Sequence, residues 1–271
     1  MTAPANAPAA PRRRANLVKP VSQGQVVRSE WIKLRTVRST WFVLAAAIMG
    51  IVGIGLLVSY VNNAHWSTMG ASSRDAFHPI NQSLIGVNVA ELAIGVLGVL
   101  VATGEYTTGM IRATFGAVPR RLPVLVAKTG VLAAVTFAVS LVAVLIAFLG
   151  GQALLGSHGI SLGHPDAARA VLGASLYLTG VGVIGIGLGF LVRSTAGGIA
   201  TLLTVLFVLP IMTAALPDAF GRYLPSTTGR ALFVTNGGDA MMSPWAGFGV
   251  FLLYIVVVVA AAALSLQRRD A

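Results

Sequence analysis

The chain has 271 residues, of which 56% are hydrophobic and only 10% charged, and its formal net charge is +11. A soluble domain carries about 25% charged residues, and a disordered chain has few apolar residues, so this composition excludes both classes. The absence of cysteine excludes disulfides, thiolate metal sites and a cysteine nucleophile.

The first segment, residues 1–20, is rich in Ala, Pro and Arg, and we expect it to be a disordered basic tail. Ser22 and Gln25 then have the spacing of a capping box, which starts a helix. We expect this helix to be amphipathic and to lie in the membrane interface, or else to form a docking surface for a cytoplasmic partner. Glu30 fits either reading. The apolar stripe comprises Val26, Val27, Trp31, Leu34 and Val37.

Six apolar stretches follow, each long enough to cross a bilayer as a helix. Backbone groups in lipid must be satisfied within their own segment, so the expected fold class is all-α, a polytopic membrane protein with six transmembrane helices. The amphipathic helix precedes them, and a short helix is expected in the loop after the second span. Together they form one domain, residues 21–271, with spans at about 41–61, 84–103, 125–149, 170–192, 198–216 and 245–266.

Six spans place fifteen of the 19 Lys and Arg residues on one side of the membrane and four on the other. The positive-inside rule assigns the fifteen to the cytoplasm, so both termini are expected there. Arg far outnumbers Lys, and Ala and Gly are abundant, which is typical of a GC-rich bacterial source. The expected location is therefore the bacterial plasma membrane.

Glu91 is the one ionisable residue well inside a predicted span, and such residues face a cavity or the bundle interior. The stripe around it is either a helix-packing seam, which small residues favour, or a wall of the transport path with Asn88 and Glu91 as its polar groups. We favour the seam, because Glu91 lies near the outer third of the span. The stripe repeats every three or four positions, at Asn88, Glu91, Gly95, Gly98 and Ala102.

The loop after the second span reads Gly104-Glu105-Tyr106-Thr107-Thr108-Gly109-Met110-Ile111-Arg112-Ala113-Thr114-Phe115. Pro119 limits how far a helix can run in this loop. We expect a short helix that lies along the membrane and is displayed to the cytoplasm. The alternative is a basic loop that does no more than obey the positive-inside rule.

Together these segments resemble the permease subunits of type-2 ATP-binding-cassette (ABC) transporters, in the form common in actinobacteria, over about residues 24–271. The resemblance rests on the order of several motifs relative to the spans: Ser29-Glu30-Trp31-Ile32-Lys33-Leu34-Arg35-Thr36-x-Arg38-Ser39-x-Trp41, Gly104-Glu105-Tyr106-x-x-Gly109-x-Ile111-Arg112, Pro119-Arg120-Arg121, Tyr223-Leu224-Pro225-Ser226 and Arg268-Arg269-Asp270.

In that family the loop after the second span forms a coupling helix, which docks into a cleft on an ATPase subunit. The resemblance implies that this chain contacts an ATPase through the matching positions. The family commonly has Thr where this chain has Met110. The implied contact residues are Glu105, Tyr106, Gly109, Ile111 and Arg112.

The chain lacks the motifs it would need to act alone. None of its lysines follows a glycine, so it has no P-loop, and it has no His-Glu-x-x-His or Gly-x-Ser-x-Gly motif. We expect no cofactor, no metal and no nucleic-acid partner. The histidines fall in predicted external loops with irregular spacing, which favours solvated side chains: His65, His78, His158 and His164. An intramembrane enzyme is therefore disfavoured.

The sequence predicts a permease subunit that exports an unidentified substrate, using ATP hydrolysed by a separate cytoplasmic ABC ATPase. Its other expected partners are membrane lipid and a second permease subunit, identical or different. The alternative is a non-transporting membrane anchor or a sensory subunit of an ATPase complex.

Overall fold

The computed structural model describes residues 22–117, 121–213, 218–238 and 241–268, and within these ranges it contains helices and no strand. The predicted tail, residues 1–20, lies outside the described residues. The six long apolar helical segments confirm the predicted number of spans, and they are Arg38–Ala64, Val87–Thr107, Arg121–His158, Pro165–Val192, Thr195–Thr213 and Pro244–Arg268.

Several spans consist of more than one helical element. Span one contains α2 (Arg38–Met49), a π-helical turn (Gly50–Ile54) and α3 (Gly55–Ala64), and span five contains α10 (Thr195–Leu203), a second π-helical turn (Thr204–Val208) and α11 (Leu209–Thr213). The others are α6 (Val87–Thr107), α8 (Arg121–Leu155, continued by a 3₁₀ turn), α9 (Pro165–Val192) and α14 (Pro244–Arg268). The shorter helices are α1 (Gln23–Thr36), α4 (Ala71–Asp75), α5 (Pro79–Ser83), α7 (Met110–Ala117), α12 (Asp218–Gly221) and α13 (Pro225–Arg230).

Each of the six spans extends beyond its predicted bounds at one end or at both. The second continues four residues past the predicted end at 103, so Glu105 and Tyr106 belong to the last turns of α6. The third continues past 149 to Leu155, and within this extension the side-chain amide of Gln152 donates to the carbonyl oxygen of Pro79. Hydropathy marks where residues stop suiting lipid, whereas a helix ends where its backbone hydrogen bonds end. The fifth begins three residues early, at Thr195, and residues 214–216 of its prediction lie outside the described part.

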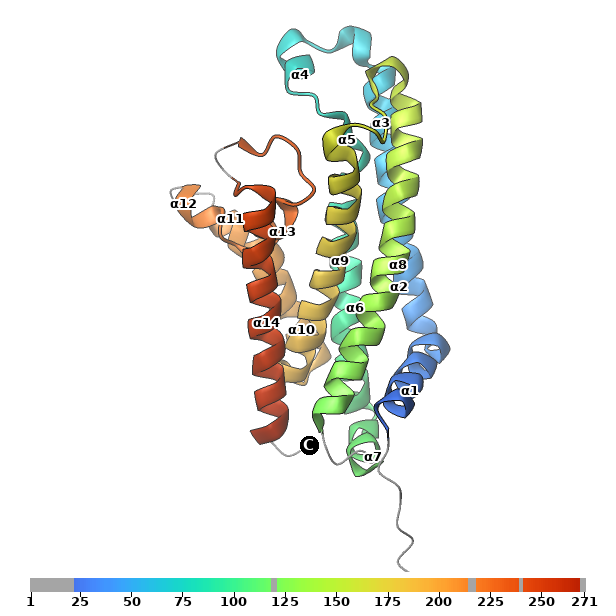
Figure 1. The fold of residues 1–271 in the computed structure, drawn as a ribbon, viewed down its shortest axis with the longest axis vertical. Helices are drawn as coiled ribbons and strands as arrows, with labels where there is room; N and C mark the ends of the chain where they lie inside the picture. The colour runs from blue at the N-terminus through green and yellow to red at the C-terminus, as the bar shows by residue number, and fades with distance from the viewer. Residues whose placement is uncertain (1–21, 118–120, 214–217, 239–240, 269–271) are drawn as a thin grey trace, which may run out of the picture.

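The long helices run side by side along the molecule, with α1 and α7 at one end and α4, α12 and α13 toward the other (Figure 1). We call these the α1–α7 end and the α4–α13 end. The central helix is α9, which packs against α6, α8, α10 and α14. Its approach to α6 requires glycine, because a Cβ added at Gly98 would lie 2.1 Å from the carbonyl oxygen of Gly182. Gly98, one of the small residues of the stripe, therefore lies at a close contact between α6 and α9.

The predicted amphipathic helix is α1, and its capping box is present: the Ser22 amide donates to the side chain of Gln25 at 2.9 Å. The expectation that its apolar stripe faces lipid is wrong for Val26 and Leu34. Both are buried, together with Glu30, because the three recur every four residues and α1 packs that face against α8. Val26 packs with Val124 and Ala127. The outward residues are Val27, Trp31 and Val37.

Candidate functional site

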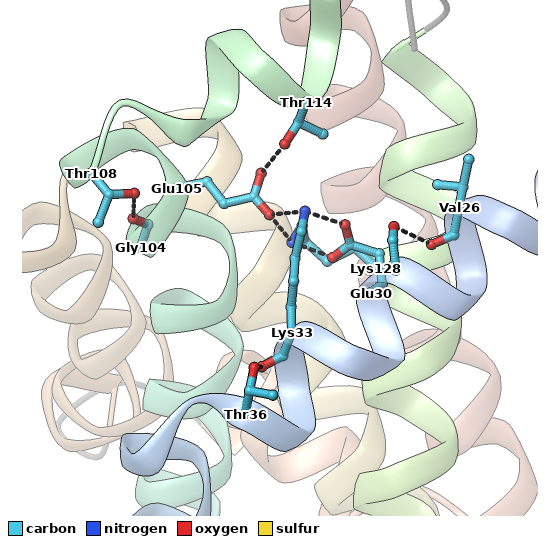
Figure 2. A network of polar contacts seen from close by, with 10 residues as sticks. Val26, Glu30, Lys33, Thr36, Gly104, Glu105, Thr108, Thr114 and Lys128 are labelled. Atoms are coloured by element: carbon cyan, nitrogen blue, oxygen red, sulfur yellow. Dashed lines mark hydrogen bonds and ion pairs between the residues drawn. The ribbon is translucent and has the colours of Figure 1, made fainter. Parts of the chain in front are cut away.

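Four charged side chains from three helices meet at the α1–α7 end. Glu30 and Lys33 come from α1, Glu105 from α6 and Lys128 from α8 (Figure 2). We call these four residues the charge cluster. The Nζ atom of Lys33 lies 2.7 Å from Glu30 and 2.8 Å from Glu105, and the Nζ atom of Lys128 lies 2.5 Å from Glu30 and 2.7 Å from Glu105. Each ammonium group therefore bridges both carboxylates.

The cluster is largely shielded from solvent. The side chains of Lys128 and Glu30 are each 3% exposed, that of Glu105 is 8% exposed and that of Lys33 is 28% exposed. Removing charges from water costs several kcal/mol per ion, so such groups persist only when opposite charges and hydrogen bonds compensate them. Two acids and two bases give a neutral set. Its members are separated by up to 98 residues in the chain, so the cluster joins α1, α6 and α8.

Lys33 remains a cation within this cluster. Burial by itself lowers the pKa of Lys33, but its hydrogen bonds to Glu105 and Glu30, together with their charges, raise it by more. The net pKa lies above the ordinary value for lysine. The side chain is therefore protonated throughout the physiological range.

The charge cluster also contacts the short helix that follows α6. The hydroxyl of Thr114, in α7, donates to Glu105 at 3.4 Å. At the start of α8, Arg121 donates to the carbonyl oxygen of Leu266 in α14 at 2.7 Å. Polar interactions at this end therefore connect α1, α6, α8 and α14 with one another, and α6 with α7.

The turn between α6 and α7 projects from the surface beside the cluster. Thr107, Thr108, Gly109 and Met110 are all exposed. Gly109 has φ +71°, in the left-handed region that favours glycine. The turn is therefore exposed and is fixed in shape by a glycine that few other residues could replace.

The residues that the resemblance implies as ATPase contacts lie in different environments. Glu105 and Ile111 are buried, so the carboxylate expected to face a partner instead faces Lys33 and Lys128. Tyr106 is half-buried and packs edge-on against Phe190 at 6.2 Å between ring centroids.

Gly109, by contrast, is exposed. The backbone of Arg112 lies in α7, and its side chain is outside the described part of the structure. The five implied contacts therefore do not share one exposed surface.

A second ion pair, between a fully buried carboxylate and a partly exposed guanidinium, lies toward the α4–α13 end. Glu91 is fully buried and accepts hydrogen bonds from the phenol of Tyr177 in α9 and from the guanidinium of Arg230 in α13, the latter at 2.5 Å. Asn88, one turn away, is half-buried. Glu91 thus lies inside the chain, where it joins α6 to α9 and to the segment between spans five and six.

Residues 26–233 match the family model described as ABC-2 family transporter protein. The chain belongs to this family. No curated protein matches it. The chain is therefore an ABC-2 permease, the membrane component of an ABC transporter, and in this family a separate ABC ATPase associates with the permease and hydrolyses ATP.

The segment that matches the family model contains both groups of paired charges described above. It begins in α1 at Val26 and ends at Phe233, so it includes the charge cluster, the exposed turn and the Glu91 pair. The sixth span, α14, lies beyond it. The charge cluster and the Glu91–Arg230 pair are thus both part of the permease domain.

Glu30, Glu105 and Glu91 stand out in the sequence, but their pairing with Lys33, Lys128 and Arg230 does not. Lys33 and Lys128 are among the fifteen cations that the positive-inside rule assigns to the cytoplasm, and Arg230 is among the other four. A signal was available for Lys128, because it stands within an apolar run and a charge at such a position needs a partner.

Proposed function

We propose that this permease exports its substrate, that its α1–α7 end faces the cytoplasm, and that an ABC ATPase docks on the turn between α6 and α7. The observation that carries the proposal is the charge cluster, which joins α1, α6 and α8 directly behind the exposed turn. A displacement of the turn by the ATPase would therefore reach three helices at once.

The structure refines which side chains we propose for each task. We propose that Gly109, Tyr106 and Arg112 contact the ATPase, together with the exposed residues of the turn. Glu105 and Ile111 are buried, so we assign them to holding the turn on the bundle. We assign Glu91 to the packing seam and not to the transport path, because α9 and α13 enclose it.

A second permease subunit, identical or different, would complete the path. Spans five and six are the least buried: in the most apolar 18-residue segment of each, only 17% of the residues are buried inside the chain. Their outward side chains are large and apolar, including Ile211 and Leu253, which are 74% and 61% exposed. Such faces suit either lipid or another subunit.

Single-cysteine labelling tests the proposed orientation, and the chain has no native cysteine to interfere. Ser157→Cys and Ser72→Cys, exposed at the α4–α13 end, should react with an impermeant maleimide in whole cells. Ser29→Cys and Thr107→Cys, exposed at the other end, should react only after the cells are opened. Labelling of Thr107→Cys in intact cells would reverse the proposed orientation.

Gly109→Val tests the docking turn. A β-branched residue at φ +71° costs about 1–3 kcal/mol, so the turn must reorganise, and we expect about ten-fold less co-purified ATPase. The permease would be tagged and isolated in mild detergent from its native membranes. The co-purified Walker A protein and its ATP hydrolysis are then quantified.

The matched control is Gly70→Val, at the opposite end, where an added Cβ meets nothing within 4 Å. It should leave the association unchanged. Unchanged association in Gly109→Val would place the docking elsewhere, with the exposed face of α1 as the next candidate.

Compounds that raise ATP hydrolysis and accumulate in inside-out vesicles support export, whereas an ATPase that responds to none supports an anchor or sensory role.

A further inference from the structure

Side chains of α1, α2, α6 and α8 and of the turn before α7 surround a cavity of about 470 Å³ at the α1–α7 end. Sites that enclose small ligands have volumes of about 300–1,000 Å³, so this cavity is large enough for one. Exposed residues of the turn, Thr107, Thr108 and Met110, form part of its rim. The cavity is thus accessible from the surface of the chain.

The two ends of the cavity differ in polarity. Along α6 and α8, one end carries Glu105 and Lys128 of the charge cluster, whose other two members, Glu30 and Lys33, also line the cavity. The other end is lined by aliphatic side chains, namely Leu97, Leu100, Val101 and Val131. Figure 2 shows the polar end, where Lys33 and Glu105 lie between α1 and α6. A ligand that fills this cavity needs a polar head and an apolar tail.

The length of the cavity matches one leaflet of a bilayer. Its lining extends along α6 from Thr107 to Leu97, ten residues or about 15 Å at 1.5 Å per residue. The hydrocarbon core of a bilayer is about 30 Å thick, so one leaflet contributes about 15 Å. An acyl chain lying along α6 would therefore reach from the interface to the middle of the membrane.

Charge distinguishes the kind of headgroup. Both carboxylates of the charge cluster are already paired with two ammonium groups. Lys33 donates two of its three N–H groups to them and is 28% exposed, which leaves one donor for a further acceptor. Arg35 and Arg38 are exposed beside Val37, where the chain bends from α1 into α2; we call this bend the α1–α2 elbow. Between residues 22 and 40, Glu30 is the only acid. The polar end suits an anion.

We propose that this cavity binds one phospholipid of the adjoining leaflet, with an acyl chain along α6 and an anionic headgroup at Lys33. The bound lipid would fill the space between the α1–α2 elbow and α6. The proposal goes beyond the docking of an ATPase and does not depend on it. Residues 1–21 of the chain are the competing occupant.

Photolabelling in nanodiscs tests the site with the full chain. One probe is phosphatidylglycerol with a diazirine near the end of one acyl chain, and the other is phosphatidylcholine with the same chain. We expect both probes to label residues 97–101, and the anionic probe about five-fold more, which is the effect of one nearby cation. Peptide mass spectrometry measures the labelled fraction.

Two substitution pairs locate the chain and the headgroup. Leu100→Trp fills the apolar end and should reduce labelling several-fold, whereas Leu92→Trp, an outward position of the same helix, should not. Lys33→Gln should lower phosphatidylglycerol labelling to the phosphatidylcholine level, whereas Arg35→Gln, outside the lining, should leave a clear preference.

Three results overturn the proposal. Equal labelling of the wild-type chain by the two probes refutes an anionic headgroup site. Absence of label at residues 97–101 in the wild type refutes lipid binding, and its appearance after deletion of residues 1–21 identifies that segment as the occupant. Labelling that Leu100→Trp leaves unchanged places the lipid outside the cavity. The two-probe comparison uses the wild-type chain, so it stands even if a variant fails to fold.

Discussion

Lys128→Met should destabilise the chain by about 3–5 kcal/mol, the cost of removing one partner from a buried ion pair. The Nζ atom of Lys128 bridges Glu30 and Glu105, and its side chain is 3% exposed. Without it, two buried carboxylates share the single ammonium group of Lys33. The change is measured as the shift in denaturant midpoint in detergent micelles, followed by the fluorescence of the four tryptophans.

Two further variants show whether charge causes this loss. Lys33→Met should cost less, because Lys33 is 28% exposed and water compensates part of the change. Adding Glu30→Gln to Lys128→Met leaves one acid and one base, so the double variant should regain a large part of the stability. A double variant no more stable than Lys128→Met would show that packing of the lysine stem, and not charge pairing, holds the three helices together.

Arg230→Met should also destabilise the chain, because it leaves the fully buried Glu91 without its cation, but by less than the ~3–5 kcal/mol of a fully buried pair, since the Arg230 side chain is itself 30% exposed. Burial lowers the pKa of Arg230, but Tyr177 and Glu91 raise it by more, so the guanidinium is charged at every relevant pH. The loss should be greatest in the segment around α13. Limited proteolysis and the denaturant midpoint measure these two effects.

The same pair offers its own controls. Tyr177→Phe removes one hydrogen bond to a charged group and should cost about 1.5–3 kcal/mol. Glu91→Gln combined with Arg230→Met removes both charges and should be more stable than Arg230→Met alone. If the combined variant folds but transport falls while ATPase binding persists, Glu91 contributes to the transport path as well as to the seam.

The number of spans could be predicted because each span is a local property of the sequence. A run of about twenty apolar residues identifies a membrane helix without knowledge of its neighbours. The start of α1 could be predicted for the same reason, since Ser22 and Gln25 are three residues apart. The ends of α6 and α8 could not, because Tyr106 and Gln152 are polar enough to end a hydropathy window while remaining helical.

The buried ion pairs are properties of packing, and no local pattern encodes them. Glu105 meets Lys33 across 72 residues, and Glu91 meets Arg230 across 139. Each charge signals that it needs a partner, but the partner is chosen by which helices lie side by side. The stripe of α1 has the same difficulty, since Val26 suits a neighbouring helix as well as it suits lipid.

The length of α8 makes bilayer thickness a variable in the geometry of the charge cluster. Its 35 residues span about 52 Å, whereas the hydrocarbon core is about 30 Å thick. Near its far end Gln152 donates to Pro79 and Ser83 and accepts from Ile160 at 2.8–3.0 Å, and near its other end Lys128 binds two acids. A thinner membrane increases the tilt of a helix this long, and a thicker one decreases it. Because α8 is anchored at both ends, that tilt displaces the two anchor points in opposite directions.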